Sequence, residues 1–557
     1  MNQNRLIVVL SGEIASGKST LAKNLSKVHG FKLLKTRDAL IKHASSRINI
    51  KNRGALQKFG EKLDKDTKGE WIVKYFQSEI NASNRIVIDS IRIIEQVNSL
   101  RNAYGHQNVM HIHVHASPDA LEKRYFSRNN IKDLNDIEAT HKYKTYKANS
   151  TEQKVKDLIH EADLVIEAEN SSEEDNLVQA ASFLRILPST FTNNVDVLIG
   201  GQFGSEGKGQ IAGYLAPNYD CLIRVGGPNA GHKVFETPSA DTFHIIPSGA
   251  RRAPNAKIII GPGAVISEEV ILSEIRKYDL EPSRLIIDEN ATVISEGDKE
   301  LERALSRIGS TKQGVGGATA NNIINRLKSE DTHKAKYVNN FKQFIGNSRS
   351  EYEKLFADNK KILLEGTQGT FLSLHHGFYP FVTSRDTTAS GCLAEAGISP
   401  LRVRKIIMVT RRYPIRVQSP NNGTSGPFTK SEFGQYQIDK KTSFPSEITF
   451  EEIANRSEHK EDLVALEKTT TTKLNRRVAE FSWSLFREAS EINSPTDIAL
   501  TFADYISYSN RLSRRYDQLS TKTKKFIEEL ERCSGVNVSL IATGFKHRSV
   551  IDRRNWI

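Results

Sequence analysis

Two glycine-rich segments of the chain carry residue types that suit phosphate chemistry. The first, Gly12 to Ser19, has the spacing Gly-x4-Gly-Lys-Ser and contains Lys18. The second, Gly200 to Gln210, combines closely spaced glycines with a single lysine, Lys208. Glycine lets backbone N–H groups approach an anion, and a lysine adds a point charge. Both segments therefore predict binding of phosphate groups.

Each glycine-rich segment follows an apolar run that is typical of a buried strand. These runs are Leu6 to Leu10 and Val195 to Ile199. After the first segment, Leu21, Leu25 and Val28 recur at helical spacing. A strand before the loop and a helix after it form the context that a P-loop needs.

The P-loop pattern predicts a nucleoside triphosphate and Mg²⁺ as ligands of the first segment. Lys18 would reach the β- and γ-phosphates, and Ser19 would hold Mg²⁺. Asp89 ends the apolar run that begins at Arg85, where a carboxylate can hold Mg²⁺ through water. The expected nucleotide contacts are Gly12, Gly17, Lys18, Ser19 and Thr20.

The elements that position these loops alternate between strands and helices. Further strands are predicted at 85–89, 110–115 and 163–166, with helix-like stretches between them. Such alternation predicts an α/β fold with a parallel sheet. At 557 residues the chain is too long for one ordinary domain. We expect a boundary near residue 193, with a first domain at 1–193 that includes a linker and a second mixed α/β domain at 194–557. The polar region 420–473 is predicted to form mobile loops.

Composition indicates a cytoplasmic protein with small polyanionic ligands. The formal net charge is +13, which suits nucleotides or nucleic acid. Because no nucleic-acid-binding motif is recognisable, we expect no direct nucleic-acid binding. No apolar run approaches the length of a membrane helix, roughly 18 residues, and the first residues do not resemble a signal peptide. The cysteines Cys221, Cys392 and Cys533 lack metal-type spacing, which favours a reducing compartment.

Residues 5 to about 170 resemble the compact nucleoside monophosphate kinases. The nearest group is that of the archaeal-type adenylate kinase and dephospho-coenzyme A kinase. By this resemblance Arg37 fits an acceptor phosphate. Arg124 and Arg128, one helical turn apart, are either a cationic lid or a solvated helix face.

The second half of the chain resembles the adenylosuccinate synthetase family, through several separate motifs that recur in the family's order. They are 200–210, 224–232, 243–249, 260–263, 308–311, 364–370, 379–384 and 542–544. The resemblance implies a ligase that phosphorylates the 6-oxo group of a purine nucleotide and then lets aspartate displace the phosphate. It also implies Mg²⁺ and a nucleoside triphosphate.

The resemblance also assigns roles to individual residues. His232 would stabilise charge at the 6-oxygen, Lys208 the transferring phosphoryl group, and Gln368 would contact the purine. The Gly231 carbonyl would be a Mg²⁺ ligand. Further nucleotide contacts would come from Gly204, Glu206, Gly207, Gly209, Asn229, Ser310, Thr311, Thr383, Asp504, Thr543 and Gly544. Thr472 and Arg476 would bind aspartate. Arg326 lies within one position of an arginine that the family borrows from a partner subunit, which implies a homodimer.

Ser205 departs from the family at the position of a catalytic aspartate. A serine hydroxyl has no useful pKa for taking the purine N1 proton. One interpretation is an inactive site. Another is a changed substrate, because a shorter side chain beside N1 leaves room for the 2-amino group of guanine. The second interpretation resembles the phage branch of the family that acts on dGMP and makes 2-amino-2'-deoxyadenylosuccinate.

Three other departures bear on the ligands. Leu474 replaces an arginine that reaches the ribose 2'-OH, which suits a deoxyribose. Phe502 replaces the lysine of a guanine-reading motif that ends in Asp504, so ATP or dATP becomes a credible phosphoryl donor, with GTP as the alternative. Ser373 and His375 replace acidic residues, and the sequence assigns no consequence to that change.

These observations favour a bifunctional purine nucleotide enzyme. Its ligase part would join L-aspartate to GMP or dGMP, and its N-terminal part would phosphorylate a nucleoside monophosphate. Two alternatives stay open at this stage. One is ordinary adenylosuccinate synthesis from IMP with GTP, and the other is a nucleotide sensor whose ligase part is inactive.

Overall fold

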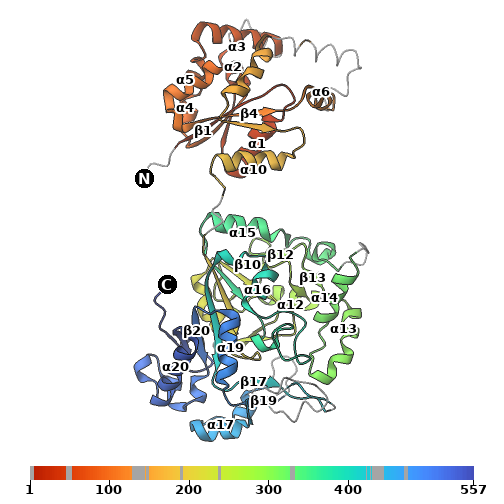
Figure 1. Ribbon diagram of the computed structural model, residues 1–557, viewed down its shortest axis with the longest axis vertical. Coiled ribbons are helices and arrows are strands. Elements are labelled where there is room, and N and C mark those ends of the chain that lie inside the picture. The colour runs from red at the N-terminus through yellow and green to blue at the C-terminus, as the bar shows by residue number, and fades with distance from the viewer. Residues whose placement is uncertain are drawn as a thin grey trace. The chain divides into compact units, whose positions relative to one another are not determined.

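The chain divides into two compact units, Met1–Leu187 and Pro188–Ile557. The computed structural model in Figure 1 describes residues 5–44, 53–127, 145, 150–187, 192–235, 240–326, 333–421, 423–426, 428, 445–468 and 475–556. The division falls a few residues before the boundary expected near residue 193. The two units are described separately.

The first unit is built on a five-stranded parallel sheet in the order β2-β3-β1-β4-β5. Its strands are β1 Leu6–Ser11, β2 Lys32–Lys35, β3 Arg85–Asp89, β4 Val109–His115 and β5 Leu164–Glu167. Its helices are α1 Lys18–His29, α2 Thr36–His43, α3 Arg53–Thr67, α4 Trp71–Asn81, α5 Ile94–Tyr104, α6 Pro118–Phe126, α9 Ser150–Asp157 and α10 Glu173–Phe183. The predicted α/β fold with a parallel sheet is confirmed.

The central strand β1 is buried on both faces, which explains its uninterrupted apolar run. Ile7 and Val9 pack against residues of α4 and α5, whereas Val8 and Leu10 pack against α1 and α10. Helices therefore cover both faces of the sheet, and Figure 1 shows α4 and α5 on the side opposite α1 and α10.

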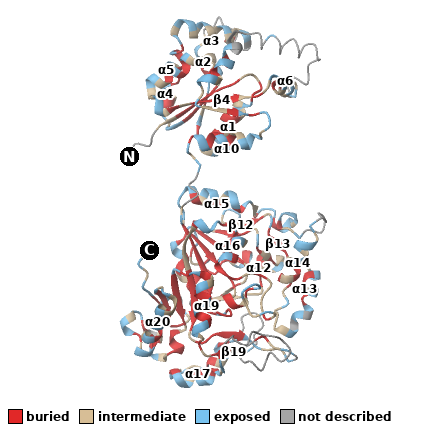
Figure 2. Cartoon of the chain, viewed as in Figure 1, coloured by how far each residue is buried: buried red, intermediate tan, exposed pale blue. Residues whose placement is uncertain are grey.

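The second unit contains a ten-stranded sheet in the order β14-β12-β10-β7-β15-β6-β16-β20-β21-β22. Its strand neighbours run parallel, except that β22 is antiparallel to β21. The strands are β6 Val195–Gly200, β7 Cys221–Arg224, β10 Lys257–Ile260, β12 Leu285–Asp288, β14 Ile345–Gly346, β15 Ile362–Glu365, β16 Val403–Arg411, β20 Asp497–Thr501, β21 Val538–Ala542 and β22 Val550–Asp552. All of β6 is buried, and Figure 2 shows buried strands through both units.

Helices and three small sheets complete the second unit. The helices are α11 Lys208–Leu215, α12 Glu268–Lys277, α13 Glu296–Leu301, α14 Val315–Ile324, α15 Ser348–Ala357, α16 Ala389–Ala396, α17 Phe450–Ser457, α18 Leu463–Leu466, α19 Trp483–Asn493 and α20 Thr521–Ser534. The small sheets pair β8 His232–Phe235 with β9 Ala240–Phe243, β11 Val265–Ile266 with β13 Thr292–Val293, and β17 Ile415–Val417 and β18 Glu447–Ile448 with β19 Arg476–Ala479.

The expectation of loops throughout 420–473 is wrong for the described residues 445–468. They contain β18, α17 and α18. Thr449 caps α17 reciprocally with Glu452, and Phe450 and Ile453 are buried in a local cluster. A capping box before a short apolar pair stabilises one or two helical turns without a long periodic pattern. None of the described helices is long and apolar enough to cross a membrane.

Candidate active site

A cavity of about 320 Å³ opens at the carboxyl ends of the central strands of the second unit. The loops that follow β6 and β15 both line it, and these two strands are neighbours in the sheet. In open parallel sheets, ligands bind outside the carboxyl ends of the strands, where neighbouring loops diverge. The expected site residues that line it are Gly204, Ser205, Glu206, Gly207, Lys208, Gly209, Asn229, Gly231, His232, Ser310, Thr311, Gln368, Thr383 and Arg476.

Four expected contacts do not line this cavity. Arg326 is exposed just after the end of α14, and Asp504 and Thr543 are buried. The Gly544 carbonyl accepts a hydrogen bond from Gln210 Nε2 at 2.5 Å, while the next residue, Phe545, does line the cavity. Thr472 and Leu474 lie outside the described residues.

The phosphate loop after β6 is organised around the buried carboxylate of Glu206. This group accepts hydrogen bonds from the backbone N–H of Gln202 at 3.1 Å and of Gly204 at 2.8 Å. Lys208 Nζ lies 2.6 Å from Glu206 Oε2, and the two side chains are almost fully buried. An ammonium group has three N–H donors, so Lys208 retains donors for a phosphate oxygen.

Ser205 stands at the rim of the same loop. It is exposed, lines the cavity and has a left-handed backbone, with φ 58°. Its carbonyl accepts a hydrogen bond from Arg411 Nη1 at 3.2 Å. Because the backbone is held from behind by a buried arginine, the length of the side chain at this position sets how far the loop reaches into the cavity.

His232 is paired with a buried carboxylate, Glu365, which no sequence motif singles out. Its Nδ1 lies 2.6 Å from Glu365 Oε1, and Glu365 also accepts hydrogen bonds from the backbone N–H of Ser248 at 2.7 Å and from the Ser248 hydroxyl. This contact indicates that the imidazole proton is on Nδ1 and is donated to Glu365. Nε2 is therefore the ring nitrogen that can contact a ligand. Glu365 was detectable only as an acid at the end of an apolar strand.

Burial controls the charge of this pair. Burial, together with the nearby Arg224, lowers the pKa of His232 to about 4, against the opposing effect of Glu365. Burial raises the pKa of Glu365, but Arg224 and the hydrogen bonds from His232 and Ser248 lower it to about 2. At neutral pH the free protein therefore holds a neutral imidazole on an ionised carboxylate.

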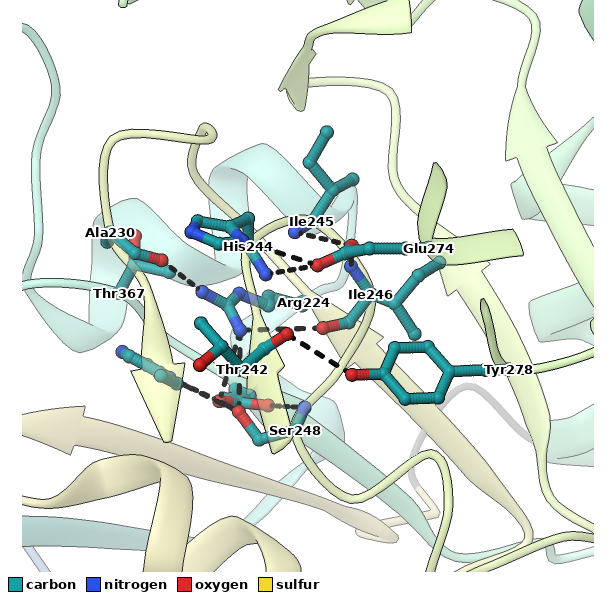
Figure 3. A network of polar contacts seen from close by, with 12 residues as sticks. Arg224, Ala230, Thr242, His244, Ile245, Ile246, Ser248, Glu274, Tyr278 and Thr367 are labelled. Carbon is teal, nitrogen blue, oxygen red and sulfur yellow. Dashed lines mark hydrogen bonds and ion pairs between the residues drawn. The ribbon is translucent and has the colours of Figure 1, made fainter. Parts of the chain in front are cut away.

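Arg224, at the end of β7, fixes the loop that carries His232. Its guanidinium donates to the carbonyls of Ala230 at 2.6 Å and Ile246 at 3.4 Å, as Figure 3 shows. In the same network Glu274 accepts from the backbone N–H of Ile245 at 3.0 Å and of Ile246 at 2.9 Å. Ala230 is thereby tied to β7 two residues before the imidazole, and Arg224 and Glu274 together hold the segment that follows β9.

Gln368 presents an unused acceptor to the cavity. Its Nε2 donates to Thr383 Oγ1 at 2.9 Å, while its Oε1 is buried without a hydrogen-bond partner among the described residues. The residue also has a left-handed backbone, with φ 64°. A buried unpaired carbonyl costs about 1–3 kcal/mol, so a ligand N–H donor at this place is favoured.

The one described residue expected to bind aspartate is held by a buried acid. Arg476 Nη1 lies 2.9 Å from Glu467 Oε2, and Glu467 Oε1 accepts from Arg411 at 2.9 Å and from the Tyr505 hydroxyl at 3.0 Å. Burial raises the pKa of Glu467, but Arg411 and Arg476 outweigh that effect and hold the pKa below its ordinary value. The guanidinium of Arg476 is thus oriented at the cavity wall.

The wall near the phosphate loop is aromatic at Phe502, the residue that replaces the lysine of the guanine-reading motif. Phe502 and Phe545 both line the cavity, with ring centroids 5.5 Å apart. The Arg411 guanidinium lies 3.9 Å from the Phe502 ring centroid. Asp504 is only 1% exposed, and its carboxylate oxygens have no hydrogen-bond partner among the described residues. Asp504 lies outside the cavity and faces His459, whose Nε2 is 3.9 Å away.

Ser373 has a structural partner that the sequence did not predict. It is fully buried, and its hydroxyl donates to Asp386 Oδ1 at 2.8 Å. It also accepts hydrogen bonds from the backbone N–H groups of His375 and His376, each at 3.2 Å. Ser373 therefore holds the turn after Gln368.

The first unit has its own cavity, of about 420 Å³, around the P-loop. It is lined by Gly12, Lys18, Ser19, Arg37 and Asp89, whereas Gly17 and Thr20 do not line it. Gly17 has φ 103° and is the N-cap of α1, and Lys18 Nζ donates to the Glu13 carbonyl at 3.0 Å. Arg124 donates to the carbonyls of Ala168 and Glu169, which ties it to the loop after β5, and Arg128 lies outside the described residues.

Comparison with known proteins places the second unit in a well-defined group. A family model described as adenylosuccinate synthetase matches residues 197–333 and 323–513. The adenylosuccinate synthetase of Methanocaldococcus jannaschii is 35% identical over 369 residues, which cover 64% of this chain and 96% of that protein. The enzyme of Pyrococcus horikoshii is 34% identical over 371 residues, which cover 65% of this chain and 99% of that protein.

Two solved structures share the fold. One is the succinoaminodeoxyadenylate synthetase of cyanophage S-2L bound to dGMP and to dATP as an energy donor. It has 26% identity and a TM-score of 0.53, and covers 65% of this chain and 96% of that chain. The other is the fully ligated adenylosuccinate synthetase of Plasmodium falciparum. It has 21% identity and a TM-score of 0.54, covers 65% and 100%, and is alike in fold.

Proposed function

The chain belongs to the adenylosuccinate synthetase family, whose ligases join aspartate to a purine nucleotide, and we propose that its acceptor is a guanine nucleotide, GMP or dGMP. The product would be 2-amino-adenylosuccinate or its deoxy form. The phosphoryl donor would be ATP or dATP.

The observation that carries this proposal is the position of Ser205. It lines the same cavity as His232 and Gln368, and its carbonyl is fixed by Arg411. A carboxylate in place of the hydroxyl would extend further into the cavity from the same anchored backbone. The shorter serine leaves that volume for the 2-amino group of guanine. The cyanophage structure that was solved with dGMP belongs to a relative of this chain.

The reaction would proceed in two displacements. The purine 6-oxygen attacks the γ-phosphorus of the donor, the bond from that phosphorus to the nucleoside diphosphate breaks, and the purine N1 proton passes to water. The amine of aspartate then attacks C6, the C6–oxygen bond breaks, and inorganic phosphate leaves. Both steps build charge on oxygen atoms, so positioning and charge stabilisation by the protein carry the catalysis.

His232 and Lys208 would supply the positive charge for the first displacement. Lys208 would bind the transferring phosphoryl group from its place beside Glu206. Anionic phosphates raise the pKa of a nearby imidazole, so nucleotide binding would protonate His232 at Nε2. Glu365 would stabilise the resulting imidazolium through Nδ1, and Gln368 Oε1 would accept a purine N–H.

Magnesium fits both cavities as a partner of substrate phosphates. Mg²⁺ prefers oxygen ligands and usually combines few protein oxygens with phosphates and water. Ser19 and Asp89 offer such oxygens in the first unit, and the Gly231 carbonyl offers one in the second. Among the described residues no group of three or more His, Cys, Asp or Glu could hold a metal ion alone. Bound Mg²⁺ would neutralise phosphate charge.

The aromatic wall supports an adenine donor. Phe502 and Phe545 offer stacking surface to any purine, while Asp504, the group that would read guanine N1 and N2, does not line the cavity. Initial rates with ATP, dATP and GTP test this proposal. ATP or dATP should support turnover at least as well as GTP, and a requirement for GTP would overturn the donor assignment.

Replacing Glu365 by glutamine should lower ligase kcat by about 10- to 100-fold, because the buried hydrogen bond to the imidazolium is worth about 1–3 kcal/mol. Glu365 raises the pKa of His232, so its loss should lower that pKa in the complex. Activity that needs the imidazolium falls as pH rises through this pKa. In Glu365→Gln the fall should therefore begin at lower pH than in the wild type. The measurement is kcat against pH.

Glu269→Gln is the matched control, because Glu269 is exposed on α12. Its pH profile should match that of the wild type. An unchanged profile in Glu365→Gln would contradict the proposed pairing of Glu365 with a protonated His232.

We further propose that the ligase is a homodimer. Arg326 is exposed and lies outside the cavity of its own unit, so a contact between Arg326 and the nucleotide requires a second copy of the chain. Mixing His232→Ala with Arg326→Ala should restore part of the ligase activity that each variant lacks. Monomeric sedimentation with full activity would contradict this.

The first unit is proposed to phosphorylate a nucleoside monophosphate. Lys18 and Ser19 stand at the start of α1, and Arg37 lines the same cavity as a candidate for the acceptor phosphate. The full chain with ATP, Mg²⁺ and a nucleoside monophosphate, without aspartate, should form nucleoside diphosphate. Lys18→Ala should abolish this activity and leave the ligase reaction intact.

The direct test of the ligase proposal is product analysis by mass. The purified chain, aspartate, Mg²⁺ and ATP should convert dGMP or GMP to a succinylated product. Product from IMP alone would contradict the guanine assignment, and nucleotide binding without any product would indicate a sensor.

A further inference from the structure

The cavity of the first unit contains a polar cluster that phosphate binding does not explain. Asp64 of α3 accepts two hydrogen bonds at Oδ1, from Trp71 Nε1 at 2.6 Å and from Gln96 Nε2 at 2.8 Å. Gln96 Oε1 in turn accepts from the backbone N–H of Arg92 at 3.1 Å. Asp64, Trp71 and Gln96 form what we call the Asp64 cluster, and all three line the cavity.

Within the described part of the chain, the Asp64 cluster leaves one carboxylate oxygen without a hydrogen bond. Both hydrogen bonds from the cluster go to Oδ1, so Oδ2 can still accept from a ligand. Burial raises the pKa of Asp64 despite the hydrogen bonds from Trp71 and Gln96. A carboxylate in that setting gains from each further N–H donor. Gln57, two helical turns earlier on α3, also lines the cavity, and its buried Nε2 has no hydrogen-bond partner among the described residues.

The Asp64 cluster shares its cavity with the residues that suit the phosphate of an acceptor nucleotide. Arg37 and Arg92 line the same cavity and suit the acceptor phosphate, as the P-loop suits the donor phosphates. Gln96 stands in the first turn of α5 and links Arg92, which precedes that helix, to Asp64, because it accepts from the Arg92 backbone and donates to the carboxylate. Leu40, Leu56 and Ile91 supply apolar lining for a flat ring.

We propose that Asp64 reads the base of the acceptor nucleotide and selects a purine that carries an N–H donor on its Watson–Crick edge and no added carboxylate. This inference rests on the proposed kinase function of the first unit. The acceptors would be purine monophosphates such as dGMP or its 6-amino analogue. The succinylated product of the second unit would be rejected.

The rejection follows from charge and from hydrogen bonding. An ionised carboxylate only accepts hydrogen bonds, so Asp64 Oδ2 favours the N1–H of guanine or an exocyclic amino group. The ligase product carries two extra carboxylates on its 6-substituent. Placing them beside a half-buried Asp64 brings like charges together in a medium of low dielectric constant.

This selectivity orders the reactions that the two units carry out. The kinase step joins the acceptor's phosphate oxygen to the γ-phosphorus of ATP and breaks the bond to the leaving ADP oxygen. Because the succinylated nucleotide is excluded, an elimination must first break the bond between the 6-nitrogen and the succinyl carbon. The succinyl group leaves as an unsaturated dicarboxylate, and its proton ends on the 6-amino purine or in solvent. The two units of this chain therefore do not act on consecutive intermediates.

The test uses the full chain with ATP and Mg²⁺ but without aspartate, so that the ligase cannot turn over. The acceptors are dGMP, 2,6-diaminopurine deoxynucleoside monophosphate, 1-methyl-dGMP and the succinylated product. We expect kcat/KM for the succinylated product to be at least about 100-fold below that for dGMP, and for 1-methyl-dGMP about 10- to 100-fold below.

Asp64→Asn is the decisive variant, with Asp66→Asn, an exposed residue of the same helix, as its matched control. Asp64→Asn should raise KM for dGMP about 10- to 100-fold and raise the relative rate with the succinylated product, because the repelling charge is gone. If Asp64 is merely structural, Asp64→Asn will lower kcat/KM equally for all acceptors. An unchanged ratio between acceptors would therefore overturn the inference.

A binding titration separates this inference from the kinase assignment. If no acceptor is phosphorylated, the kinase proposal fails, and equilibrium dialysis with the same nucleotides decides the role of Asp64. Preference for dGMP over the succinylated nucleotide that Asp64→Asn abolishes would sustain the base reading. Unchanged binding of both nucleotides in Asp64→Asn would overturn it, because the ligase site of the second unit is the same in both proteins.

Discussion

His232→Ala will lower ligase kcat by about 1,000-fold, with little change in KM for the nucleotide. Removing a positioned proton donor typically costs between about 100- and 10,000-fold, and His232 is further organised by Glu365 at 2.6 Å and by the anchored loop of Arg224 and Ala230. The loss should fall on kcat because the imidazolium acts on charge that develops at the 6-oxygen. The measurement is steady-state kinetics with dGMP, aspartate and ATP.

The control for His232→Ala is His376→Ala, an exposed residue outside the cavity. It should retain wild-type kinetics. A His232→Ala enzyme with full kcat would refute the role of this imidazole. If the wild-type protein binds nucleotide but forms no product, the protein is a sensor and not a ligase.

Ser205→Asp will shift the acceptor preference from guanine toward hypoxanthine. The carboxylate occupies the space proposed for the 2-amino group and restores a group that can take the N1 proton. We expect the ratio of kcat/KM for dGMP to that for dIMP to fall by about 100-fold, near the upper range for a pocket change of this size. Competition of the two acceptors in one reaction measures the ratio directly.

Ser205→Ala distinguishes the effect of side-chain size from the effect of the hydroxyl group at this position. Alanine keeps the room and removes the hydroxyl, so its preference for dGMP should match that of the wild type. If Ser205→Ala loses as much kcat/KM for dGMP as Ser205→Asp does, the steric interpretation is contradicted. The hydroxyl would then have a chemical role.

The sequence predicted the phosphate loops because their signals are local. Glycine and lysine spacing after a buried run determines both the turn and the ligand, and β1 and β6 begin at the predicted residues. The alternation of strands and helices likewise predicted the α/β fold. These features depend on neighbours within about a dozen residues.

The pairings that tune the site were not predictable in the same way. Glu365 reaches His232 across 133 residues, and Glu467 reaches Arg411 across 56. Periodicity does not record which strands become neighbours, so a buried acid at a strand end has no visible partner in the sequence. For Asp504 the motif predicts a base contact, and the structure buries its side chain 3.9 Å from His459, so that contact stays a prediction.

Residue type alone also did not predict the cluster in the first unit. Asp64, Trp71 and Gln96 come from three different helices, α3, α4 and α5, and meet only through packing. Their spacing in the sequence matches no short motif. Such a site becomes visible when hydrogen-bond partners are counted and one carboxylate oxygen is left over.

The structure of the protein with dGMP bound tests the central claim most directly. We predict that the guanine lies in the cavity of the second unit with its 2-amino group against Ser205 and its 6-oxygen beside His232 Nε2. A guanine whose 2-amino group faces away from Ser205, or no binding of dGMP where IMP binds, would contradict the assignment of this ligase to guanine nucleotides.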